Sequence, residues 1–134
     1  MPTIDEIQDL LRKEPGDVFL NYSLAMVQKK EGLDDEALAS LMAGCDTLLV
    51  DGTFFTETEM IDQGVGTKTA ASMGHLPQSG ERGMLAELAR FADKRRILIH
   101  INNTNPILDP DSPERATVTA AGVEVAYDGM EIQP

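Results

Sequence analysis

The feature that most constrains this chain is a short apolar run, residues 97–101, which follows two arginines and precedes an amide-rich loop. The run is too short for a helix and lacks polar alternation, so it predicts a strand that is buried on both faces. His100 is the polar exception near its end. A histidine there is either a hydrogen-bonded core side chain or a group that binds a metal ion or a substrate, and a histidine taken alone favours the first interpretation.

Charge excludes some classes of partner. The chain has 134 residues, of which 42% are hydrophobic and only 4% aromatic, which allows one domain, or two small modules, with an aliphatic core. Its 23 acidic and 11 basic residues give a formal net charge of −12. That charge repels phosphate backbones and anionic lipid headgroups, so we expect no binding to nucleic acid and none to membranes.

Cysteine content and the first residues favour the cytoplasm. Cys45 is the single cysteine, so no intramolecular disulfide forms, which suits a reducing compartment. The N-terminus has no basic segment followed by a long apolar one, and no later run is long enough to span a bilayer. We therefore expect a soluble cytoplasmic protein.

Residues 1–44 are expected to be helical throughout. Thr3 and Glu6 have the spacing of a capping box, and a helix then runs as far as the Pro-Gly pair at 15–16. Asp17 is placed to cap a second helix and Asp34 a third. The helix pair implied by residues 17–43 resembles a single tetratricopeptide repeat. An incidental helical hairpin explains the same pattern, because no second copy follows.

From residue 45 onward the pattern changes to alternating strands and helices. Strands are predicted near residues 46–50, 96–101 and 123–127, and helices near 80–93 and 113–121, where Ser112 is a strong cap. This order predicts a parallel βαβαβ layer. The polar segment 53–78 is long enough to be either functional or disordered. Glu57, Glu59 and Asp62 within it predict a solvated face.

Ligands of open α/β sheets bind at the carboxyl ends of the strands, and three such ends carry polar side chains. These are Asp51 on the first strand, His100 and Asn102 on the second, and Asp128 on the third. Purely structural roles explain the same residues, since an aspartate at a strand end often caps a turn and loop asparagines often bond to backbone groups.

Several longer motifs point to a family. They are VDGTFFTETEM at 50–60, GHLPQSG at 74–80, HINNTNPIL at 100–108, DSPERA at 111–116 and YDGMEI at 127–132. From about residue 40 to Ile132 the chain resembles the C-terminal part of the pyrroloquinoline quinone (PQQ) biosynthesis protein B family. The resemblance implies half of a metallo-β-lactamase-like αββα sandwich at residues 45–134, preceded by a helical region at 1–44.

The resemblance also implies a metal site, with iron or zinc as the cofactor. His100 matches a late histidine ligand, Asp51 matches an aspartate position that joins two metals, and His75 is a candidate ligand or pocket residue. Asn102, Asn103 and Asn105 are candidate cofactor-binding residues.

The implied role is PQQ biosynthesis, through metal-dependent oxidation of a tyrosine-derived precursor or through carriage of PQQ. The family's early ligand cluster has no counterpart here, which suggests a truncated or fused member that binds metal weakly and leaves enzymatic activity open. A homo-oligomer or a complementing partner chain would cover the sheet. The alternative is a non-catalytic protein-binding module built on the helical hairpin.

Overall fold

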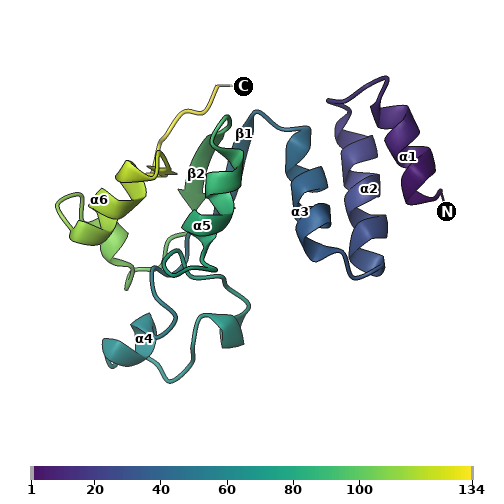
Figure 1. Cartoon of the computed structure of the whole chain (residues 1–134). Coiled ribbons are helices and arrows are strands. Elements are labelled where there is room, and N and C mark those ends of the chain that lie inside the picture. Colours follow the sequence, from purple (N-terminus) through teal and green to yellow (C-terminus); the bar gives the residue numbers. More distant parts are fainter. Residues whose placement is uncertain (1, 134) are drawn as a thin grey trace. The chain divides into compact units, whose positions relative to one another are not determined.

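The computed structural model describes residues 2–133 and divides into two compact units, Met1–Asp46 and Thr47–Pro134 (Figure 1). Each unit is described by itself. Among the described residues, no helix combines the length and apolarity needed to cross a membrane.

The first unit consists of three helices, as the sequence predicted: α1 (Ile4–Leu11), α2 (Val18–Lys30) and α3 (Asp34–Ala43). The capping box is confirmed, because the Thr3 hydroxyl accepts from the Glu6 amide and the Glu6 carboxylate accepts from the Thr3 amide. The Asp17 cap is also confirmed, since its carboxylate accepts from the amide of Leu20 at 2.7 Å.

The predicted Asp34 cap is wrong. Leu33 occupies the cap position of α3 without a side-chain bond, and Asp34 is already the first helical residue. The tight connection from α2 explains the shift: Gly32 has φ +79°, and the amide of Leu33 donates to the carbonyl of Gln28. The acidic side chains of the first turn of α3 instead favour the positive end of the helix dipole.

The helices pack through small and aliphatic side chains. The buried core joins Ile7 of α1 to Leu24 and Val27 of α2, and the buried Ala25 and Ala37 belong to the neighbouring helices α2 and α3.

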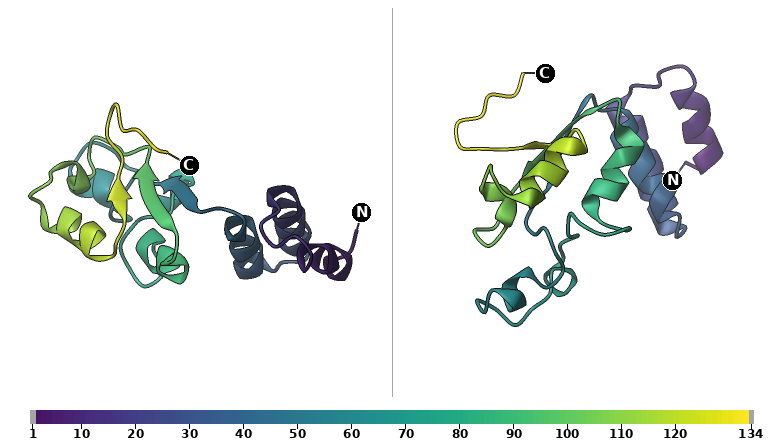
Figure 2. Two further views of the ribbon diagram at one scale, coloured as in Figure 1. Left: turned by 90° about the horizontal axis from the view of Figure 1, so that it is seen from above. Right: turned by 60° about the vertical axis from the view of Figure 1, so that its left-hand side comes forward.

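The second unit contains a three-stranded parallel sheet in the order β1-β2-β3. Its strands are β1 (Thr47–Asp51), β2 (Arg95–Ile99) and β3 (Glu124–Val125). Each parallel strand is joined to the next by a right-handed crossover. Because the strand order runs the same way from β1 to β3, both crossovers lie on the same face of the sheet. Figure 2 accordingly shows α5 (Met84–Leu88) and α6 (Pro113–Ala120) together on one side of the sheet.

Shorter elements complete this unit. They are the helix α4 (Glu59–Asp62) and the 3-10 turns η1 (Ala71–Met73), η2 (Ala89–Phe91) and η3 (Pro106–Leu108). The Ser112 cap of α6 is confirmed, because the Ser112 hydroxyl accepts from the amide of Arg115.

Three predicted boundaries are wrong. The helix predicted at 80–93 starts only at Met84, because Gly80 has φ +92° and the amides of Gln78 and Ser79 bond to the carbonyls of residues 54 and 55. The second strand ends at Ile99, because His100 has φ +56°. The third strand is limited to two residues.

Arg96 ties the sheet to its helices. The two arginines before the apolar run differ: Arg95 is exposed and paired with Glu124, whereas Arg96 is only 6% exposed. The Arg96 guanidinium donates to the carbonyl of Leu88 at the end of α5 and to the carbonyls of Ala121 and Gly122 after α6. One side chain of β2 thus donates hydrogen bonds to backbone carbonyls at the ends of both covering helices.

We predict that Asp17→Ala lowers the free energy of unfolding by about 1 kcal/mol, because α2 loses its capping acceptor. Asp34→Ala is the matched control and should lower it by only ~0.3 kcal/mol, since only a dipole interaction is lost. Urea denaturation followed by far-ultraviolet circular dichroism measures both. Equal losses would show that Asp34 does cap α3.

We also predict that Arg96→Met costs roughly 2 kcal/mol or more, because buried carbonyls lose their donors. Arg95→Met removes the same charge from the neighbouring exposed position and should have a much smaller effect. Thermal unfolding of the two variants compares them directly, and similar melting temperatures would contradict the role assigned to Arg96.

Candidate metal centre

Three side chains that are distant in the sequence meet beyond the carboxyl ends of β1 and β2. Asp51 ends β1, His100 follows β2, and His75 lies in the long segment between them. One ligand atom from each lies within 4.8 Å of the other two. The Nδ1 atom of His75 is 2.9 Å from one Asp51 carboxylate oxygen, and the Nδ1 atom of His100 is 3.4 Å from the other.

Both imidazoles use Nδ1 toward the centre of this cluster. An ionised carboxylate only accepts hydrogen bonds, so the His75 contact with Asp51 requires a proton on His75 Nδ1. The Thr53 hydroxyl lies 2.6 Å from Asp51 Oδ1 and 3.0 Å from His100 Nδ1. If Thr53 donates its single proton to Asp51, His100 Nδ1–H donates to Thr53. An ion bound at the centre of the cluster would take the place of these protons on Nδ1.

The surroundings keep Asp51 ionised. Partial burial raises the pKa of its carboxyl, but hydrogen bonds from Thr53, His75 and His100, together with the charge on His75, outweigh that effect. The pKa of Asp51 therefore lies below its ordinary value. Asp51 is a carboxylate donor at neutral pH.

His100 is not a core histidine. Its side chain is 73% exposed, because the positive φ at residue 100 turns the chain out of the strand. Histidine adopts this left-handed region more readily than most residues other than glycine. The His75 ring is more enclosed: it packs edge-on against Phe54, with centroids 5.6 Å apart, and lies 5.8 Å from the ring of His100.

Asn105 holds the loops that carry the cluster. Its side chain is buried and donates to the carbonyls of Gly52 and Thr53, while its own carbonyl oxygen accepts from the amide of Ile107. Gly52 is required at this crossing, because a Cβ there would lie 2.8 Å from the Cβ of Leu98. Asn105 thus connects the loop after β1 to the loop after β2.

Glu59 is a buried structural carboxylate, so the solvated face predicted for it is wrong. It is 4% exposed and accepts from the amide of Phe55 and from the Thr104 hydroxyl. Asn102 in turn donates to the Thr104 hydroxyl. This network fastens the start of segment 53–78 to the loop after β2.

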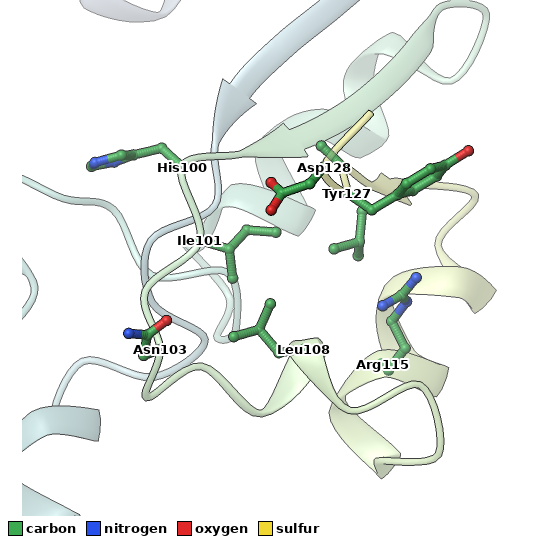
Figure 3. Close-up of a pocket in the computed structure, with 9 residues that line it drawn as sticks. His100, Ile101, Asn103, Leu108, Arg115, Tyr127 and Asp128 are labelled. Atoms are coloured by element: carbon green, nitrogen blue, oxygen red, sulfur yellow. The ribbon is translucent and has the colours of Figure 1, made fainter. Parts of the chain in front are cut away.

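Asn103 and Asp128 lie away from the cluster. They line a cleft of about 530 Å³ that borders His100, together with Ile101, Leu108, Arg115, Val125, Ala126 and Tyr127 (Figure 3). Asp128 is not part of the group of close ligand atoms. The structure therefore brings together Asp51, His75 and His100, buries Asn105, places Asn102 in the loop network and leaves Asn103 exposed.

Sequence reasoning missed Thr53 and Glu59 as supports of the cluster, and Arg115 in the cleft. A threonine two residues after a candidate ligand was the available signal for Thr53. Burial of Glu59 had no comparable signal, because acidic residues in a polar segment usually face solvent.

Comparison with known proteins identifies the family. The profile described as "Beta-lactamase superfamily domain" matches residues 31–101, a range that includes α3 and the first two strands. Coenzyme PQQ synthesis protein B of Pseudomonas putida strain F1 is 59% identical over 101 residues, which are 75% of this chain and 33% of that protein. The protein of the same name from Pseudomonas entomophila strain L48 is 57% identical over 102 residues, 76% of this chain and 34% of that one.

A solved structure supports the same assignment. The crystal structure of Zn²⁺-bound PqqB from Methylobacterium extorquens matches with a TM-score of 0.67 and 49% identity, over 72% of this chain and 35% of that one. This chain therefore spans about a third of the length of the relatives that it matches. Its parallel sheet, its motifs and these matches agree: the chain belongs to the metallo-β-lactamase-like superfamily and, within it, to the family of coenzyme PQQ synthesis protein B.

Proposed function

We propose that this chain holds a zinc or iron ion through Asp51, His75 and His100, and that the ion serves the synthesis of PQQ. The observation that carries the proposal is the convergence of the three ligand atoms within 4.8 Å of one another, beyond the ends of two parallel strands.

The chemistry of the donors fits such an ion. Two imidazoles and one carboxylate form a set that both zinc and non-haem iron accept, and zinc–nitrogen and zinc–oxygen bonds are about 2.0–2.2 Å long. Donors around one ion are thus separated by roughly 3–4 Å, which is comparable with the Asp51–His75 and Asp51–His100 distances of 2.9 and 3.4 Å. The related structure supports metal binding, since the Methylobacterium protein is Zn²⁺-bound.

A bound ion would supply Lewis acidity or, with iron, redox chemistry. The protein's own residues fix the donors: Thr53 orients both Asp51 and His100, and Phe54 confines the ring of His75. With three donors from the described residues, we expect weak binding and little turnover by the chain alone, because further positions are left to water.

The family name supports a role in PQQ synthesis, and the substrate we propose is a tyrosine-derived PQQ precursor that undergoes metal-dependent oxidation. Carriage of PQQ is the other role that the family resemblance implies. The single cysteine favours a reducing compartment, and we propose the cytoplasm. A homo-oligomer or a complementing chain remains our proposal for supplying further ligands.

A second candidate function is protein binding by the helical unit. α2 exposes Phe19 and Tyr22, which are 75% and 50% exposed, beside an apolar groove of about 440 Å³ that includes Ile7 and Met26. Exposed aromatic side chains around a groove are typical of interaction sites. Loss of PQQ synthesis on Phe19→Ser, with metal binding unchanged, would support this role.

We predict that the chain, reconstituted anaerobically with Fe²⁺ or Zn²⁺, binds the ion weakly and that Asp51→Asn, His75→Ala and His100→Ala each reduce the affinity at least about 10-fold. Asp93→Asn removes the same charge at the opposite end of β2 and is the matched control. Isothermal titration calorimetry and metal analysis measure the effect. Equal binding by all variants would refute the site.

We further predict that Thr53→Val lowers metal affinity about 10-fold, because Asp51 and His100 lose their shared hydroxyl partner. Thr53→Ser retains that hydroxyl and should bind nearly as well as the parent chain. Valine occupies almost the same volume as threonine, so the pair separates hydrogen bonding from packing. Identical affinities for the two variants would show that the hydroxyl is not needed.

A further inference from the structure

The cleft beside the metal centre contains a cation with unused donors. Arg115 of α6 reaches into it, and within the described part of the chain its guanidinium makes a single hydrogen bond, to the carbonyl of Ile107 at 2.8 Å. No carboxylate within the described residues pairs with Arg115. A guanidinium has five N–H donors, so several are left for a bound molecule.

Within the described residues Arg115 lacks a carboxylate partner, as the buried Arg96 does, although the chain is strongly acidic. Acidic residues outnumber basic ones by 23 to 11, and two other arginines of the second unit do have carboxylate partners: Arg95 binds Glu124 and Arg90 binds Glu87. Arg115 is only half-buried, yet it is held in the cleft by the bond to a backbone carbonyl. Its side chain is therefore positioned in advance, which lowers the entropy cost of binding an anion.

The rest of the cleft fits the body of an organic acid. Ile101, Leu108 and Val125 provide apolar walls, and the largely exposed ring of Tyr127 lies at the rim near Arg115 (Figure 3). Asp128 lies between Arg115 and His100 along the cleft in this view. Its negative charge disfavours a second anionic group at that end, so the carboxylate of a ligand is directed to Arg115.

We propose that this cleft binds a small carboxylic acid with an apolar or aromatic body, whose carboxylate is held by the Arg115 guanidinium and whose neutral end lies toward His100. Guanidinium and carboxylate match in shape and charge. The subsite rests on the proposed function for the chemistry at its far end, but the contact with Arg115 does not require a metal ion.

The test uses two probes that differ in one group. They are 3-(4-hydroxyphenyl)propionate and 4-ethylphenol, which lacks the carboxylate, titrated into the full metal-free chain in EDTA and followed by amide NMR shifts. We expect the acid to bind at least about 10-fold more tightly and to shift the amides of Val125 and Ala126. Equal binding of the two probes, or binding of neither, would overturn the proposal.

Variants then locate the contact. Arg115→Gln should abolish the preference for the acid, Arg115→Lys should keep part of it, and Arg82→Gln, which removes the same charge from an exposed loop, should leave it unchanged. An unchanged preference in Arg115→Gln would overturn the proposal. If Arg115→Gln fails to fold, the Arg115 Nε–H resonance of the parent chain must shift with the acid and not with the phenol.

A final comparison separates this subsite from the metal centre. Asp51→Asn should lose metal affinity and retain the preference for the acid in EDTA. Acid binding that appears only after zinc is added would mean that the ion, rather than Arg115, holds the carboxylate, and would overturn the subsite while supporting the metal centre.

Discussion

The arrangement of the candidate site depends on the buried side chain of Asn105. Its amide spans the gap between the loop after β1 and the loop after β2, with bonds to the backbone of residues 52, 53 and 107. Asp51 and His100 lie directly beside these anchored segments. Because an amide can donate and accept at once, one side chain fixes both loops without introducing a charge into the core. No aliphatic residue could replace those bonds.

Arg96 has a comparable role at the start of β2, where it bonds to carbonyls at the ends of both covering helices. The two residues fix different parts of the second unit. Arg96 fixes the helices against β2, and Asn105 fixes the loops at the opposite end of the strand. β2 lies between these two residues and connects them, and its Ile97 and Leu98 are fully buried.

Sequence alone predicted the order of the elements and the parallel strands, because apolar runs and helix caps are local signals. It also named Asp51 and His100 from their places at strand ends, whereas His75 rested on family resemblance. The sequence did not predict the backbone conformation at His100. Its positive φ shortens the strand and exposes the imidazole, and no residue pattern indicates it. Burial of Glu59 and Arg96 depends on distant partners, which local patterns do not contain.

The three side chains of the cluster are held by different kinds of structure. Asp51 and His100 are attached to paired strands, whereas His75 sits in a segment whose two ends meet through bonds from residues 78 and 79 to residues 54 and 55. Its first part is fastened to the loop after β2, because Glu59 accepts from the Thr104 hydroxyl and Gln63 donates to the Thr104 carbonyl. His75 is thus the candidate ligand whose position depends on the stiffness of residues 56–77, because ordering such a segment costs conformational entropy. If the proposed site holds an ion, stiffening this segment would strengthen the binding with an unchanged set of donor atoms.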